Sequence, residues 1–147
     1  MPCEVPSTSS CLSHTISSMM VTLEENMTSN GEMSRDLLLA LHSIFGSILV
    51  PALDLVDRRA VTLVKGENSG REVITVRGSN GTRYTLLKGC HYCPCPSYQY
   101  KVLGRGDITC KHLLAMRLAL AMQRVSVESV QDSQILDMIQ ELSEISV

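Results

Sequence analysis

Two short motifs constrain the fold of this chain more than any other feature: Cys-x-Cys at Cys93 and Cys95, and Cys-x-His at Cys110 and His112. The residues between the two motifs are enough for a loop that brings them together. Three thiolates and one imidazole make a complete tetrahedral ligand set for Zn²⁺. Because protein side chains fill all four positions, no place is left for water or substrate. The pattern therefore predicts one structural zinc ion rather than a catalytic one.

Disulfides are one alternative role for these cysteines, because the chain has six, an even number. However, the N-terminus shows no basic region followed by an apolar run, and Glu4 lies near its start, so we expect no secretory signal. We also expect no membrane association, because no segment approaches the roughly 20 apolar residues of a membrane span. A cytosolic or nuclear chain keeps its thiols reduced, which favours metal binding.

A catalytic thiol is the other alternative. Cys110 and His112 on one helix would point to different faces, which is wrong for a nucleophile and its base, so we expect no enzyme. The adjacent Cys90 and His91 could each replace a ligand. The complete pattern nevertheless favours the two motifs themselves.

Charge is distributed unevenly along the chain, although the formal net charge is only −2. Residues 58–124 hold twelve basic and three acidic side chains, a net of +9, and both flanking segments are acidic. A basic centre suggests an anionic partner, and DNA is the obvious candidate. The alternative is a solvated face on which the acidic ends fold back. The candidate DNA contacts near the zinc motif are Lys101, Arg105 and Lys111.

The first third of the chain is predicted to be helical where it is ordered. Residues 1–34 are rich in Ser, Thr and Met, and we expect a flexible or loosely ordered segment with a short helix near Ile16–Met27. After a cap at Ser34, apolar residues at helical spacing predict a further helix to about Leu49. Pro51 is then expected to bend the chain ahead of another helical turn or two.

The middle of the chain switches to a period of two, which predicts strands at residues 61–64, 72–76 and 83–87. Asn-Ser-Gly and Ser-Asn-Gly sequences between these runs are typical of hairpin turns. We therefore expect a three-stranded antiparallel meander that leads directly to the first cysteine pair.

The C-terminal part is predicted to contain a loop over residues 98–109 and two helices, over about 110–124 and 128–143. Together with the meander and the preceding helix, these elements predict one α+β domain over residues 35–147. The zinc finger occupies about residues 60–122 of it.

The helix after the second motif is apolar nearly all round, whereas a surface helix shows a single apolar stripe. We expect it to be covered on two sides, by its own sheet and by something else. Either the final helix and the sheet simply complete a core, or part of this surface belongs to a protein partner. The candidate interface residues are Leu113, Leu114, Leu118 and Ala121.

The zinc motif and its surroundings resemble a known family. Cys-x-Cys, a variable loop and Cys-x-His, preceded by a β-hairpin and followed by a helix, are similar to a SWIM-type zinc finger. The stretches Cys93–Tyr98 and Cys110–Ala115 resemble one branch closely, the small SWIM-domain subunit of the metazoan Shu complex. The resemblance implies one structural Zn²⁺ held by Cys93, Cys95, Cys110 and His112.

The same resemblance implies a non-enzymatic, nuclear adaptor. Such proteins pair with a RecA-like ATPase paralogue, as a heterodimer or a larger assembly, and promote recombinase filaments on single-stranded DNA in break repair and meiosis. Independently of the resemblance, the chain has no Gly-x-x-x-x-Gly-Lys-Ser/Thr loop, so any nucleotide chemistry must come from a partner. The alternative function is a stand-alone DNA-binding zinc module that uses the basic segment.

Overall fold

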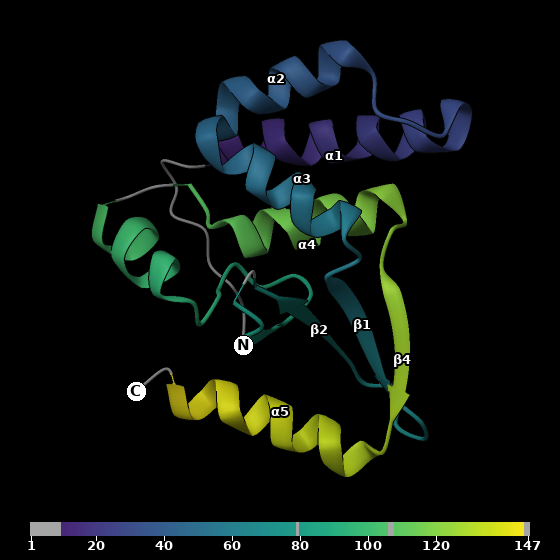
Figure 1. Ribbon diagram of the computed structural model, residues 1–147, viewed down its shortest axis with the longest axis vertical. Coiled ribbons are helices and arrows are strands. Elements are labelled where there is room, and N and C mark those ends of the chain that lie inside the picture. Colours follow the sequence, from purple (N-terminus) through teal and green to yellow (C-terminus); the bar gives the residue numbers. More distant parts are fainter. Residues whose placement is uncertain (1–9, 79, 106–107, 146–147) are drawn as a thin grey trace.

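The computed structural model describes residues 10–78, 80–105 and 108–145, which form an α+β fold, as expected (Figure 1). The elements follow one another as α1 (Ser10–Asn30), α2 (Arg35–Phe45), the 3-10 turn η2 (Gly46–Ile48), α3 (Leu49–Asp57), β1 (Val61–Gly66), β2 (Glu72–Arg77), β3 (Arg83–Leu86), the π-helical segment η3 (Tyr98–Leu103), α4 (Lys111–Met122), β4 (Ser126–Val130) and α5 (Asp132–Ile145).

The sheet has four strands in the order β3-β2-β1-β4. The first three form the expected antiparallel meander, with Val61 opposite Val76 and Arg77 opposite Arg83. The fourth strand corrects the prediction. β4 pairs parallel with β1, placing Thr62 beside Ser126, where sequence reasoning expected the final helix to begin shortly afterwards. The valines of β4 are β-branched and spaced for a strand, and this short signal was missed.

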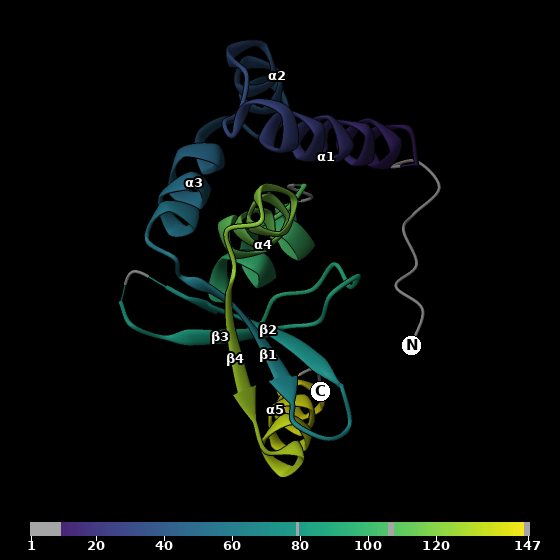
Figure 2. The same cartoon turned by 90° about the vertical axis from the view of Figure 1, so that its right-hand side faces the viewer.

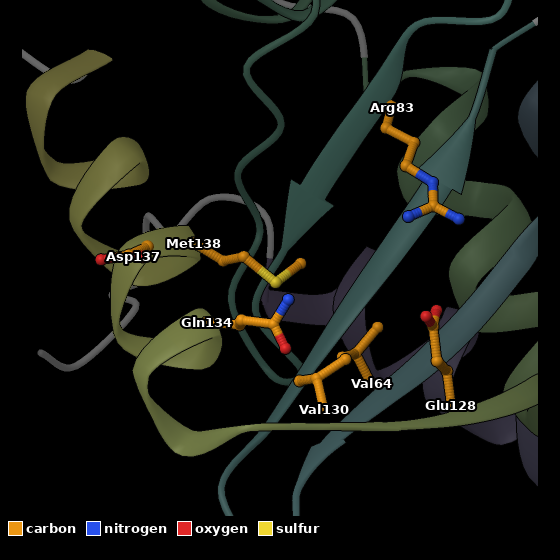
Figure 3. Close-up of a pocket in the computed structure, with 7 residues that line it drawn as sticks. All are labelled: Val64, Arg83, Glu128, Val130, Gln134, Asp137 and Met138. Carbon is orange, nitrogen blue, oxygen red and sulfur yellow. The ribbon is translucent and has the colours of Figure 1, made fainter.

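Helices cover the two faces of the sheet unequally (Figures 1 and 2). One face packs against α4, which α1 and α3 cover from the outside, so the central helix is buried on both sides. The other face carries α5 alone, over a small cluster of Val64, Val73 and Ile135. α5 therefore does not cover α4, contrary to one of the two alternatives that the sequence left open. Beside α5 lies an open cavity of about 340 Å³ (Figure 3).

The burial of α4 explains why it is apolar nearly all round. Leu114, Leu118 and Ala119 are completely buried, between the sheet on one side and the N-terminal helices on the other. Each fully buried leucine contributes about 1.5–3 kcal/mol relative to an exposed one. The second covering layer that the sequence required is thus provided by the chain itself.

The N-terminal segment forms a longer helix than expected. α1 spans Ser10–Asn30, whereas the prediction was a short helix within a loosely ordered segment; residues 1–9 lie outside the described part. Ile16, Met20 and Leu23 are buried at helical spacing, and α1 lies on α4. The tertiary contact stabilises a sequence whose intrinsic helix propensity is modest.

The helices that follow α1 also differ in detail from the prediction. Ser34 caps α2 as expected, because its Oγ accepts a hydrogen bond from the Leu37 N–H at 3.3 Å. The chain turns at Gly46, whose φ of 61° belongs to the left-handed region, rather than at Pro51. Pro51 instead lies in the first turn of α3, where its missing N–H has no helical partner to lose.

By length and composition alone, Arg35–Asp57 is apolar enough to cross a membrane, which corrects the expectation that no segment approaches a span. The same criterion is met by core helices. Leu41, Leu49 and Val56 of this stretch are buried in the core of the fold. The stretch therefore carries no argument for a membrane.

Candidate metal centre

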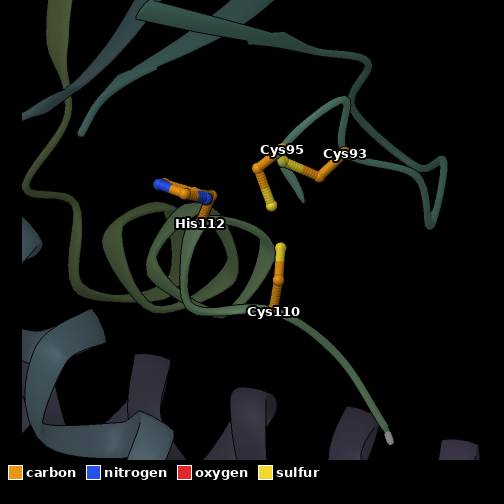
Figure 4. A group of neighbouring side chains, drawn as sticks. All are labelled: Cys93, Cys95, Cys110 and His112. Atoms are coloured by element: carbon orange, nitrogen blue, oxygen red, sulfur yellow. The ribbon is translucent and has the colours of Figure 1, made fainter. Parts of the chain in front are cut away.

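The two cysteine motifs come together at the start of α4 (Figure 4). Cys93 and Cys95 lie in the irregular segment after β3, Cys110 immediately precedes α4, and His112 is in its first turn. Their ligand atoms all lie within 4.8 Å of one another, and all four residues are buried, with exposed fractions of 1–4%. The structure thus brings together the predicted ligand set.

The geometry of this group fits a tetrahedral zinc ion. Sulfur and nitrogen atoms at about 2.3 and 2.0 Å from a common centre lie about 3.5–4 Å apart, within the observed spread. The buried Nδ1 of His112 has no hydrogen-bond partner among the described residues. A buried polar atom normally has one, and coordination would use the lone pair that no hydrogen bond takes. The four residues therefore form a closed site suited to one Zn²⁺.

Backbone N–H groups support the thiolate ligands. The Tyr98 N–H donates to the Cys95 Sγ at 3.3 Å, and the Leu113 N–H donates to the Cys110 Sγ at 3.5 Å. The Cys110 thiol caps the N-terminus of α4, where the positive end of the helix dipole also favours a negative charge. Each motif thus has one thiolate that its own backbone orients and stabilises.

The three thiols are electrostatically coupled. Hydrogen bonds from Cys110 and Cys93 hold the pKa of Cys95 below its ordinary value. Hydrogen bonding to Cys110 and Cys95, together with burial, raises the pKa of Cys93. One thiolate in such a group thus makes the next harder to ionise, and a bound dication removes this conflict by stabilising all three negative charges.

Two tyrosines that sequence reasoning missed shield the centre. The Tyr84 ring of β3 lies 4.6 Å from the His112 ring, tilted by 47°. Tyr98 is buried, and its hydroxyl donates to the His91 carbonyl at 2.6 Å. Burial and the nearby Cys95 thiol raise the pKa of Tyr84. The period of two in β3 and the spacing of Tyr98 after Cys95 were the available signals.

The neighbouring candidates lie outside the ligand group. Cys90 and His91 are not among the four clustered residues. His91 contributes its backbone carbonyl, to Tyr98. One argument against a catalytic thiol was wrong: Cys110 has extended backbone angles, φ −101° and ψ 167°, so its side chain and His112 converge on the same centre. What favours metal is that two further buried thiols share this centre.

The remaining predicted site residues fall into two groups. Lys101 and Arg105 are exposed on the finger loop, and Lys111 is partly exposed at the start of α4. The four candidate interface residues are instead buried in the chain's own core, so they are not left for a partner, which corrects their assignment. These residues are Leu113, Leu114, Leu118 and Ala121.

The fold and the site define a zinc-finger protein with a closed three-cysteine, one-histidine centre between a hairpin and a helix. The chain belongs to the SWIM-type zinc finger family, since it is 46% identical over 107 residues to the mouse (Mus musculus) zinc finger SWIM domain-containing protein 7, covering 72% of this chain and 70% of that protein. The human (Homo sapiens) protein of that name is 47% identical over 103 residues, 69% of this chain and 73% of the relative.

A more distant relative keeps the same assignment. The Dictyostelium discoideum homolog of zinc finger SWIM domain-containing protein 7 is 32% identical over 117 residues, 79% of this chain and 74% of that protein. No family model and no solved structure matches the chain. The assignment thus rests on these relatives and on the four-residue centre.

Proposed function

We propose that the protein is a non-enzymatic adaptor of homologous-recombination repair. It pairs with a RecA-like ATPase paralogue, in a Shu-type complex in the nucleus, and promotes the assembly or stability of recombinase filaments on single-stranded DNA. Zinc is structural in this proposal. It holds the segment after the hairpin against α4, so that the rest of the domain presents a rigid surface.

The observation that carries the proposal is the closed zinc centre in a chain of the SWIM family. All four ligand positions are filled by Cys93, Cys95, Cys110 and His112, so a bound zinc has no position for substrate. The sequence also lacks a phosphate-binding loop for ATP. A chain built in this way is expected to act by binding, and to leave nucleotide hydrolysis to its partner.

The surface that meets the partner must differ from the α4 residues predicted from the sequence. Apolar side chains that remain exposed lie on α2 and on the finger loop. Leu39 of α2 is 57% exposed, next to Leu38, and Leu103 of η3 is 67% exposed. We therefore assign the pairing surface to these side chains, with α2 as the first choice because a helix gives a preformed apolar face.

Co-purification of the full chain with a RecA-like ATPase paralogue tests the proposal. Leu39→Glu would place an unpaired charge in an apolar contact, and we expect it to abolish capture while the protein keeps its zinc. The matched control is Val127→Glu, because Val127 is similarly exposed but lies on the edge strand β4. If no RecA-like paralogue is captured by the wild-type chain, the adaptor proposal is wrong.

A further inference from the structure

We propose that the half of the sheet that α5 leaves uncovered is a binding site for the phosphate backbone of single-stranded DNA. α5 covers one end of this face, over Val64 and Val73. Side chains of a strand alternate between faces, so Thr62, Thr75 and Arg77 share the face with these valines. The exposed part of the face is thus polar and basic.

A cavity of about 280 Å³ lies at this end of the sheet. It lies beside the C-terminal end of α3, and its polar lining consists largely of arginines and threonines. The lining side chains that carry the argument are Arg58, Arg59, Arg77, Arg83, Thr62 and Thr75. Guanidinium forks and hydroxyl groups are the side chains that contact phosphate oxygens.

The arginines of this groove are largely without acidic partners. Arg58 pairs with Asp54 at 2.5 Å, whereas Arg59, Arg77 and Arg83 form no ion pair with the residues that the structure describes. Arg77 and Arg83 are also direct cross-strand neighbours. Like charges opposite each other destabilise a sheet, and a bound anion relieves this repulsion.

Arg59 adds a second observation. It follows α3 with a φ of 56°, in the left-handed region that favours glycine. The Arg59 and Ala60 N–H groups donate to the Val56 and Leu55 carbonyls at 3.1 and 3.0 Å, the pattern of a helix end that glycine usually occupies. The chain thus places an arginine in the groove at a position where glycine is less strained.

The neighbouring cavity limits how far an anion can extend along the face. It shares Arg83 with the groove but is also lined by Glu128 and Asp137 (Figure 3). These carboxylates repel phosphate and confine it to the arginine end. None of the described residues that line the groove is aromatic, so base stacking is not provided and binding is expected to be independent of sequence.

A single strand fits this recess better than a duplex, because α3 and α5 flank the exposed face at its two ends (Figure 2). The phosphate chemistry follows from the groove alone, whereas the choice of single-stranded DNA rests on the proposed function. An acidic peptide also pairs with arginines, and competition by such a peptide is therefore one outcome of the test.

The test measures binding of the full zinc-loaded chain to a fluorescent oligothymidylate over a series of salt concentrations. We expect Arg77→Ala/Arg83→Ala to weaken binding about 10–100-fold and to reduce the salt slope by about 1.4, because each phosphate that a single strand no longer has neutralised lowers the slope by roughly 0.7. Arg59→Gly should weaken binding while the protein folds at least as stably, because glycine suits its backbone angles. Glu128→Gln should strengthen binding.

Two controls separate the groove from general charge effects. Arg35→Ala removes a charge at the start of α2, which α4 separates from the sheet (Figure 1). Lys101→Ala/Arg105→Ala removes two charges from the finger loop. The proposal is overturned if either control weakens binding as much as its groove counterpart, if the wild-type chain does not bind, or if a polyglutamate peptide competes as well as unlabelled oligonucleotide.

Paralogue capture, measured on the same groove variants, keeps the two proposals distinguishable. Groove variants that bind DNA like wild type but still capture the paralogue overturn only the DNA site. Loss of DNA binding in the groove variants supports the site, even if the wild-type chain captures no paralogue.

Discussion

The two faces of the sheet are made by alternate residues of the same strands, yet they serve different ends. Toward α4, Val61, Ile74 and Val76 join a continuous apolar core that includes the zinc ligands. Toward α5, Thr62 and Thr75 lead to an open groove, and only a small apolar cluster is closed. The α4 face stabilises the fold, and the α5 face remains available for binding.

This contrast shows why the zinc centre lies on the α4 side. The segment between β3 and α4 is long and irregular, and its backbone alone could not hold Cys93 and Cys95 against the helix. A metal bond replaces the hydrophobic contacts that such a segment lacks. Removing metal should therefore disrupt the α4 face first.

The largest expected effect is loss of a zinc ligand. Cys110→Ser should lower zinc content to well below one ion per chain and expose the domain to proteolysis, because structural zinc sites contribute about 10–16 kcal/mol at pH 7 in isolated fingers. Elemental analysis and limited proteolysis measure this. His91→Ala is the control, since His91 lies beside the centre but outside the ligand group. A folded wild-type protein without zinc would contradict the assignment.

The next prediction compares the two cores directly. Leu114→Ala empties a completely buried position of α4 and should cost about 2–5 kcal/mol of global stability. Ile135→Ala empties an equally buried position of α5, but it lies in the small cluster, so we expect local loss of α5 with the rest of the fold retained.

Amide hydrogen exchange separates these two outcomes. With Ile135→Ala, exchange should quicken in α5 and remain slow in α4. With Leu114→Ala, protection should fall throughout the fold. Equal, uniform loss of protection in both variants would show that the two faces unfold as one unit.

A smaller effect is expected where α5 is fastened to the sheet. The Asp132 Oδ1 accepts hydrogen bonds from the N–H groups of Asn68 and Ser69 and from the Ser69 hydroxyl, at 3.4, 3.1 and 2.8 Å. These bonds, those from Ser69 above all, lower the pKa of the Asp132 carboxyl from its ordinary 3.8. A lowered folded-state pKa means that the ionised carboxylate stabilises the fold above about pH 4 and that this contribution is lost as pH falls through the folded pKa.

Exchange of the Ser69 amide reports on this fastening. In wild type it should quicken as the solution is acidified below about pH 4, relative to Asp132→Asn, in which it is already fast at neutral pH. Acid also protonates the zinc ligands, but both proteins share that loss, so their difference isolates Asp132. Identical pH profiles would show that the carboxylate does not fasten α5.

Sequence reasoning found the zinc ligands and the meander because both depend on local patterns: fixed ligand spacing and a period of two. It missed α1 as a long helix, since the stability of that helix comes from α4, about a hundred residues away in the chain. It also missed the groove. Arg59 and Arg83 belong to different elements, and only the twist and pairing of the sheet bring them to one cavity.

The interface prediction failed for a related reason. An apolar helix indicates that something covers it, but the sequence does not say whether a partner or the same chain does so. Leu113 and Leu118 are covered by elements that were expected to be disordered or to lie elsewhere. An apolar surface can be assigned to a partner only after every element of the chain has been placed.

The smallest predicted effect concerns the aromatic shield of the zinc centre. Tyr98→Phe removes the hydroxyl that donates to the His91 carbonyl at 2.6 Å and should cost about 0.5–1.5 kcal/mol in denaturant unfolding at fixed zinc concentration. The zinc ligands themselves are unchanged, so zinc stoichiometry should remain one. Tyr100→Phe is the matched control, because Tyr100 is 71% exposed and its hydroxyl reaches water. If both variants are equally stable, the Tyr98 hydroxyl does not support the segment that carries Cys93 and Cys95, and the zinc bonds alone hold it on the α4 face.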